Sequence, residues 1–117
     1  MTGPDDAPFA YNGLDRVLHE RARLGILASL VSQSEGIAFG DLRRLCGLTD
    51  GNLNRHLKVL EEAGIVALEK TIEMRRPLTT CRLTPDGRRR FLDYLETLER
   101  VVKDAAAASR KPAFQPA

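Results

Sequence analysis

One stretch of the sequence decides the fold: LTDGNLNRHLKVLEEAGIV, residues 48–66. Its apolar residues recur at spacings of four and three, the pattern of a helix buried along one side: Leu53, Leu57 and Leu60. Thr49 is a suitable N-cap, because its hydroxyl can accept a hydrogen bond from a free backbone N–H of the first turn. The stretch therefore predicts a helix that begins after Thr49, ends before a glycine and is polar on its outward side.

A second, shorter helix is predicted just before this one. Residues 41–46 place Leu42 and Leu45 at a spacing that turns both inward, and Gly47 suits the left-handed residue that closes a helix. Residues 37–39 could form a very short strand in front of it. Two helices joined by such a tight turn are typical of a helix-turn-helix, in which the first helix braces the second in a major groove of DNA.

A hairpin and a long helix are predicted after the central stretch. Residues 65–73 and 78–83 have the composition of two strands, and residues 74–77 form the turn, since proline resists a central strand position. Thr84 and Pro85 then start a helix as its N-cap and its first residue. This helix is expected to reach about Ala108.

Two helices are also predicted near the N-terminus. Asn12 can cap the first, whose apolar side consists of Leu14, Val17 and Leu18. The second covers residues 21–32. The fold class is therefore α+β and mainly helical: a winged helix-turn-helix with a two-stranded wing and a C-terminal dimerisation helix. We expect one domain over residues 12–108, with the wing at about 65–83, the last helix at about 84–108, a disordered tail at 1–11 and a flexible tail at 109–117.

Composition excludes several classes of protein. The 117 residues are 43% hydrophobic, which argues against general disorder, and no run of 18 apolar residues predicts a transmembrane span. The first residues lack the pattern of a signal peptide, so a cytoplasmic location is expected. No catalytic motif and no cofactor motif is present, so the chain is predicted not to be an enzyme.

The cysteines do not predict a metal site or a disulfide framework. Cys46 and Cys81 lie far apart in the sequence, and there is no CxC, CxxC or HxxxH motif. Each is interpreted as a small buried hydrophobe, and a redox-sensing role for either is the alternative.

Charge is distributed unevenly along the chain. The formal net charge is only +2, but residues 70–90 hold seven basic and two acidic residues, a net charge of +5. Residues 91–104 hold four acidic and two basic residues, a net charge of −2. A local basic patch in a balanced chain favours a polyanionic partner that is met on one side, and double-stranded DNA is the partner we expect.

The residues predicted to contact DNA fall into two groups. Asparagine pairs well with adenine and arginine with guanine, whereas lysine more often meets phosphate. The recognition helix supplies Thr49, Asn52, Asn54, Arg55, His56 and Lys58, and the wing supplies Lys70, Thr71, Arg75, Arg76, Thr79 and Thr80. Two alternatives stay open: His56 either touches DNA or packs beside the core, and the three arginines 88–90 either reach phosphate or form a solvated surface.

The apolar stripe of the last helix is predicted to join two copies of the chain, and a ligand pocket is the alternative. Its apolar residues recur at spacings of four, three and four, as in the seam between paired helices. The predicted dimer interface consists of Leu14, Val17, Leu18, Phe91, Tyr94, Leu95, Leu98, Val101 and Val102.

Taken together, several motifs resemble a known group of proteins. These are RLGIL at 23–27, LTDGNLNRHL at 48–57, LEEAG at 60–64 and LTPDGR at 83–88. In this order they resemble the small winged-helix transcriptional regulators of bacteria and archaea that are related to the MarR and ArsR families. The resemblance implies a homodimeric DNA-binding regulator, usually a repressor, that binds an inverted repeat. It leaves open the operator, the regulated genes and any small-molecule effector, and a winged-helix protein-interaction module without DNA affinity is the alternative function.

Overall fold

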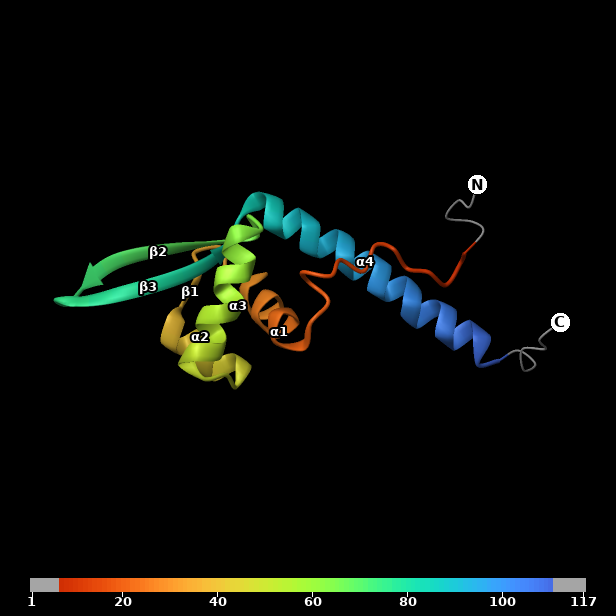
Figure 1. The fold of residues 1–117 in the computed structure, drawn as a ribbon, viewed down its shortest axis with the longest axis horizontal. Coiled ribbons are helices and arrows are strands. Elements are labelled where there is room, and N and C mark those ends of the chain that lie inside the picture. The colour runs from red at the N-terminus through yellow and green to blue at the C-terminus, as the bar shows by residue number, and fades with distance from the viewer. Residues whose placement is uncertain (1–6, 111–117) are drawn as a thin grey trace.

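The computed structural model describes residues 7–110. Its elements follow in the order α1 (Arg21–Leu30), β1 (Ile37–Ala38), α2 (Phe39–Cys46), α3 (Asp50–Glu62), β2 (Val66–Glu73), β3 (Arg76–Leu83) and α4 (Pro85–Ala108). The molecule measures 68 × 29 × 23 Å, because the β2–β3 hairpin projects from one end and α4 from the other (Figure 1). This architecture confirms the predicted winged helix-turn-helix fold. Residues 1–6 and 111–117, which belong to the two predicted tails, lie outside the described residues.

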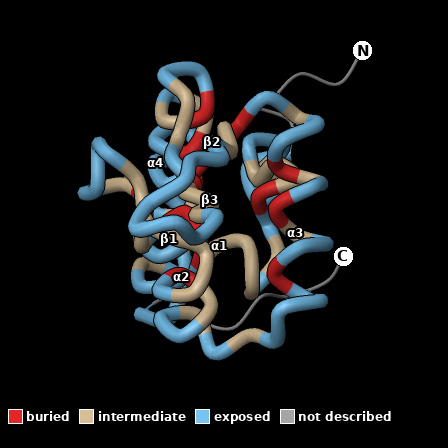
Figure 2. Tube along the Cα trace, turned by 90° about the vertical axis from the view of Figure 1, so that its left-hand side faces the viewer, coloured by how far each residue is buried: buried red, intermediate tan, exposed pale blue. Residues whose placement is uncertain are grey.

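The turn between α2 and α3 forms as the sequence predicts. Gly47 adopts a left-handed conformation, with φ of 64°, and closes α2. The Thr49 hydroxyl accepts a hydrogen bond from the backbone N–H of Asn52 at 3.2 Å and so caps α3. Leu53, Leu57 and Leu60 are at most 1% exposed, and the buried positions of α3 alternate with exposed ones along its turns (Figure 2). Local capping and three leucines therefore fix the position of α3.

The hydrophobic core lies where α1, α2 and α3 meet the base of the sheet. Ile26, Leu27 and Leu30 of α1 are fully buried there together with Leu42 of α2. Leu45 was predicted to point inward with Leu42, and this prediction is wrong, because Leu45 is 66% exposed. The inward side of α2 is formed by Phe39, Leu42 and Cys46, at spacings of three and four, and Leu45 therefore lies on the other side of the helix.

The three strands form one antiparallel sheet in the order β1-β3-β2. Ile37 pairs with Cys81 and Ala38 with Thr80, so the predicted short strand is present, although Phe39 already begins α2. Glu73 pairs with Arg76, which reduces the predicted four-residue turn to Met74 and Arg75. Pro77 is tolerated inside β3 because it lies near the free end of the hairpin, where a missing N–H costs little.

The start of α4 is attached closely to the end of the α3–β2 loop. Thr84 caps the helix by accepting a hydrogen bond from Gly87 N at 2.8 Å, as predicted, and its hydroxyl donates to Gly64 O at 2.7 Å. A Cβ atom on Gly87 would lie 2.0 Å from the carbonyl oxygen of Ile65. Only glycine therefore allows this approach between helix and chain.

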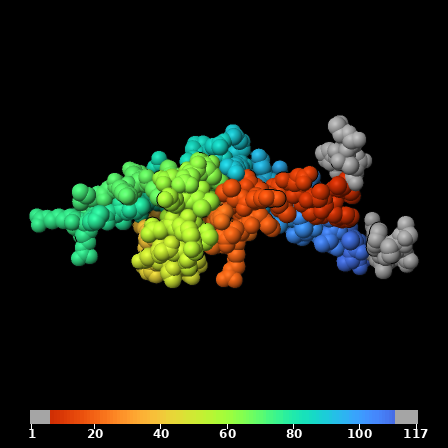
Figure 3. Space-filling view, viewed as in Figure 1, coloured from red at the N-terminus to blue at the C-terminus, as the bar shows by residue number. Residues whose placement is uncertain are grey.

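The helix predicted after Asn12 does not form. Residues 12–20 run in turns along α4, where they are held by tertiary contacts (Figure 3). Tyr11 donates to Asp104 at 2.7 Å, and Arg90 Nε donates to Asp15 at 2.8 Å. Gly13 lies so close to Thr97 that a Cβ would be 2.4 Å from its hydroxyl. So short a helix is marginal by itself, and these contacts provide the alternative.

Residue Glu20 replaces Asn12 as the first helix cap of the described chain. Its carboxylate accepts hydrogen bonds from Ala22 N at 2.9 Å and Arg23 N at 3.1 Å, and α1 begins directly after it.

Among residues 7–110, no helix combines the length and the apolar composition that crossing a lipid bilayer requires.

Candidate nucleic-acid interface

The outward side of α3 is polar and exposed. Asn52, Asn54, Arg55 and Lys58 are all exposed, as is the cap residue Thr49. Arg55 Nη2 donates a hydrogen bond to Asn52 Oδ1 at 2.7 Å, which holds the guanidinium along the helix. Side chains of these types can donate to and accept from base edges and can meet phosphate oxygens.

His56 lies on a different side of α3. Its side chain is 15% exposed, and its Nδ1 accepts a hydrogen bond from Arg23 Nε at 3.3 Å. The carboxylate of Glu20 lies 3.5 Å from the same nitrogen. The geometry favours the alternative that His56 packs beside the core, where it joins α3 to α1.

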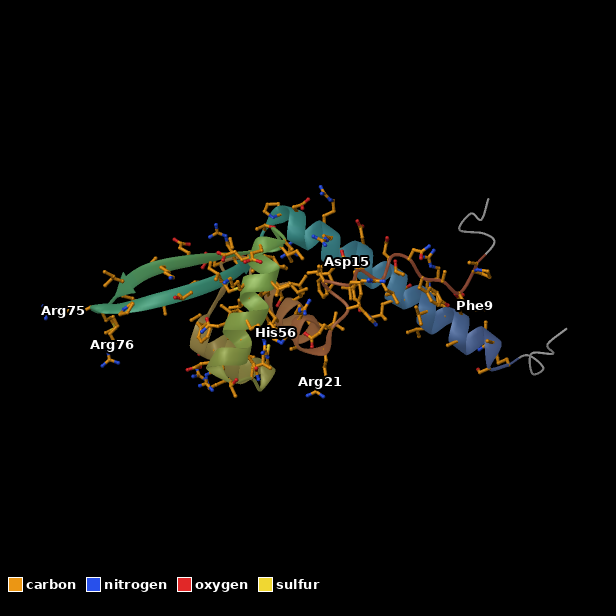
Figure 4. All side chains as sticks on the ribbon, viewed as in Figure 1. Phe9, Asp15, Arg21, His56, Arg75 and Arg76 are labelled. Atoms are coloured by element: carbon orange, nitrogen blue, oxygen red, sulfur yellow. The ribbon has the colours of Figure 1, made fainter. Side chains whose placement is uncertain are left out.

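The wing presents its predicted residues in three directions. The alternation of the β2–β3 ladder puts Lys70 and Thr79 on one side of the hairpin and Thr71, Thr80 and Arg76 on the other. Lys70 and Thr79 line a hollow of about 340 Å³ together with Asn54 of α3. Arg75 extends from the far end of the wing (Figure 4). Asn54 of the predicted helix residues thus meets Lys70 and Thr79 of the predicted wing residues about halfway along the hairpin.

The three arginines at the start of α4 have structural partners. Arg88 Nη2 donates to Val31 O at 2.6 Å, Arg90 Nη1 donates to Ala63 O at 3.4 Å, and Arg89 forms an ion pair with Asp86. The structure therefore favours neither a phosphate contact nor a merely solvated surface for Arg88 and Arg90. Two of the seven basic residues of the window, Arg88 and Arg90, thus serve to attach α4 to the domain.

The Asp15–Arg90 ion pair is the electrostatic part of this attachment. Partial burial raises the pKa of Asp15, but the bonds from Arg90 and from Val17 N outweigh that effect and lower the pKa overall. The carboxylate is thus ionised at neutral pH and secures the N-terminal segment to α4.

The apolar residues of α4 face in two directions. Phe91 and Tyr94 are at most 2% exposed within a single chain, as is Leu18. Their assignment to a dimer interface is wrong, because the core of one copy already covers them. Leu95 and Val102 are 36% and 63% exposed, and the half-buried residues are Leu14, Val17, Leu98 and Val101. Leu92, which sequence reasoning missed, is 45% exposed. Leu92, Leu95 and Val102 together form an exposed apolar row on the outer side of α4.

Comparison with known families decides which group of proteins this is. The family model described as a winged helix DNA-binding domain matches residues 22–102, which extend from α1 through most of α4. The chain belongs to the winged-helix DNA-binding domain family. The resemblance to small winged-helix regulators that the sequence motifs carry is therefore confirmed.

Individual relatives of this winged-helix protein agree with that assignment. The chain is 35% identical over 89 residues to an uncharacterised protein of Methanocaldococcus jannaschii, covering 76% of this chain and 96% of the relative. It is 32% identical over 87 residues to the uncharacterised HTH-type transcriptional regulator YdgJ of Bacillus subtilis, covering 74% of this chain and 52% of YdgJ.

A solved structure from an archaeon resembles the whole domain. The transcriptional regulator homologue of Pyrococcus horikoshii OT3 has a TM-score of 0.73 and 31% sequence identity, over 78% of this chain and 89% of its own. The relatives with a named role are transcriptional regulators, which agrees with the prediction that this winged-helix protein is not an enzyme.

The cysteines of this winged-helix protein are shielded from solvent to different degrees. Cys81 is 1% exposed on β3, and burial raises the pKa of its thiol to about 12. Cys46, at the end of α2, is half-buried, and burial raises its pKa as well. Such thiols carry little thiolate at neutral pH. Within residues 7–110, no three His, Cys, Asp or Glu side chains lie close enough to hold a metal ion.

Proposed function

We propose that this protein is a sequence-specific transcriptional regulator that binds an inverted-repeat operator as a homodimer. One observation carries the proposal: the exposed polar side of α3 and the wing share a surface, in the hollow that Asn54, Lys70 and Thr79 line. A helix and a hairpin joined in this way can contact a major groove and the neighbouring backbone at the same time.

We assign separate tasks to the exposed residues. Asn52, Asn54 and Arg55 read base edges, and Lys58 and Lys70 neutralise phosphates. Thr49, Thr71, Thr79 and Thr80 donate to the DNA backbone, and Arg75 and Arg76 meet the minor groove, whose narrow segments concentrate negative potential. His56 is left out of this set because its ring faces Arg23.

The exposed row on α4 supports the homodimer. Leu92, Leu95 and Val102 are apolar and in contact with solvent, a costly arrangement unless a second copy covers them. In a two-fold dimer the two α3 helices would occupy successive major grooves, about 34 Å apart. We propose repression as its mode of action, because a dimer seated on a promoter blocks access to that DNA.

A binding assay tests the proposal directly. Purified full-length protein is incubated with a random pool of duplexes, and bound DNA is sequenced and then titrated at increasing salt. We expect an inverted repeat with half-sites about 10 bp apart or a small multiple of that. The logarithm of affinity should fall with the logarithm of salt by about 0.9 for each phosphate contacted. Absence of any salt-dependent binding would contradict the proposal.

One observation keeps the alternative function, a protein-interaction module, under test. Ile72 and Met74 on the wing are 80% and 90% exposed, and apolar side chains of this kind also suit a protein partner. A protein-interaction module without DNA affinity would bind no duplex in a gel-shift assay, even at low salt.

The homodimer needs a test of its own. Leu95→Glu places charge in the exposed row, and we expect a monomer in sedimentation at micromolar concentration. Arg89→Glu, at an exposed position near the start of α4, is the control for added negative charge and should leave the dimer intact. A dimer that persists in Leu95→Glu would show that the interface lies elsewhere.

A further inference from the structure

The far end of the wing carries apolar side chains that contribute nothing to the core. Ile72 is 80% exposed and Met74 is 90% exposed. The last five residues of β2, from Glu69 to Glu73, are exposed throughout. Burial within the single chain therefore gives no reason for an apolar residue at the tip, and two such side chains close together on an exposed tip favour a contact made outside the single chain.

The backbone at the tip adds a second, independent observation. Met74 and Arg75 have φ values of 51° and 66°, so both residues are left-handed. A two-residue hairpin turn with this geometry normally contains Asn-Gly or Asp-Gly, because other side chains strain it. Here a long apolar and a long basic side chain occupy the two positions, and both are presented to solvent.

Apolar groups lie on both sides of the tip. Ile72 pairs with Pro77 on the side of the hairpin that also carries Lys70. On the other side, Met74 and Leu78 line an open hollow of about 600 Å³ together with Arg76. A tip with apolar groups on both sides fits between two apolar walls, and the sugar edges of a DNA minor groove are such walls.

The charge at the tip is suited to DNA as well. Glu73 lies directly across the ladder from Arg76, and Arg75 is the cation at the very end of the wing. A protein groove that receives an apolar hairpin has no general need for this arginine. The minor groove attracts it through its negative potential.

The length of the wing also fits. The five exposed residues at the outer end of β2 span about 17 Å at roughly 3.3 Å per residue. Half of a DNA turn of about 34 Å is also about 17 Å. With α3 in a major groove, a wing of this length is long enough to bring its tip to the adjacent minor groove.

We propose that Met74 is an apolar wedge that inserts at a base step of this minor groove, with Arg75 beside it as the electrostatic anchor. The inference rests on the proposed function and adds a specificity-determining residue to it. Methionine is unbranched and is among the residues that unstack a base step from the minor-groove side. The step that deforms most easily is pyrimidine–purine, so the operator should carry TA or CA/TG about 5 bp from the centre of each half-site.

The experiment uses the operator duplex that is recovered from the random pool of DNA. A fluorescent 2-aminopurine is placed beside the expected step, and full-length protein is added. We expect fluorescence to rise on binding, because the base loses its stacking neighbour. Replacement of the step by a purine–purine step should weaken binding about tenfold.

Two variants at position 74 separate a wedge from a simple contact. Met74→Ser should remove the fluorescence rise and the preference for the step, while the slope of affinity against salt stays as in the wild type. Met74→Leu, which keeps an apolar side chain of similar size, should retain both. Because Met74 is 90% exposed, neither change affects the core, and thermal melting checks this.

The outcomes distinguish this inference from the function on which it rests. Failure of the wild type to bind any duplex overturns both. Binding of DNA without a fluorescence rise, or a Met74→Ser variant that keeps the step preference, overturns the wedge alone.

Discussion

The recognition helix and the wing reach the same proposed ligand by opposite structural means. Helix α3 is fixed from within: three of its leucines are at most 1% exposed, and Thr49 caps its start. The wing is fixed only at its base, and its outer residues are exposed. Truncation of a buried α3 side chain should therefore destabilise the fold, whereas truncation of an exposed side chain at the wing tip should leave the core intact.

The largest contrast between the two regions is expected in stability. Leu57→Ala removes a buried side chain from α3 and should lower the free energy of unfolding by about 2–5 kcal/mol. Ile72→Ala on the wing, where the side chain is 80% exposed, should change it by no more than about 0.5 kcal/mol. Urea denaturation of both variants measures the difference. Equal losses would mean that the tip is packed against something in the free protein.

A smaller contrast is expected within α3 itself. Arg55→Ala should reduce discrimination between operator and random DNA by about 1–3 kcal/mol, because a base contact is lost. Lys58→Ala should weaken binding to both DNAs equally, since phosphate is the same in every sequence. Competition gel shifts with random DNA measure both effects. If Lys58→Ala alters discrimination, the two residues have been assigned the wrong tasks.

In the wing, the expected loss concerns affinity and its dependence on salt. Arg75→Ala with Arg76→Ala should reduce the salt slope by about 0.9 for each phosphate contact removed, at unchanged thermal stability. Arg89→Ala, in the same basic stretch but paired with Asp86, is the matched control and should leave the slope unchanged. A slope that responds to Arg89 instead would place the DNA on α4.

The smallest effect is expected at the turn. Replacing Met74-Arg75 by Asn-Gly relieves two left-handed positions and should stabilise the hairpin by about 1 kcal/mol. Slower hydrogen exchange of the wing amides measures this gain. Affinity for the operator should fall in the same variant. A wing that is both more stable and equally effective would show that its two side chains serve no purpose in binding.

The same contrast explains how much could be predicted from the sequence. Local rules were sufficient for the end of α2, the start of α3 and the start of α4: Gly47, Thr49 and Thr84 act as predicted because a cap requires only its immediate neighbours. The turns of residues 12–20 were not predictable in this way. They depend on Tyr11, Gly13 and Asp15 meeting α4, and these contacts span more than 70 positions of sequence.

Part of the proposed site could also be predicted from local spacing, and part depends on contacts between distant residues. Spacing identified the polar side of α3, but His56 faces Arg23, a residue of another helix that periodicity within α3 does not reveal. On α4 the apolar residues fit two adjacent rows equally well. Only the packed structure shows that Phe91 and Tyr94 belong to the inner row and that Leu92 and Leu95 are exposed.

The contact between Gly87 and the Ile65 carbonyl has a mechanical consequence. α4, whose 24 residues span about 36 Å, extends from one side of this contact, and the shorter wing extends from the other. The contact is therefore a pivot between the two. In the proposed dimer, a tilt of about 10° at this point would displace the far end of α4 by about 6 Å. The separation of the two reading helices thus depends on a joint that one methyl group, Gly87→Ala, would force apart.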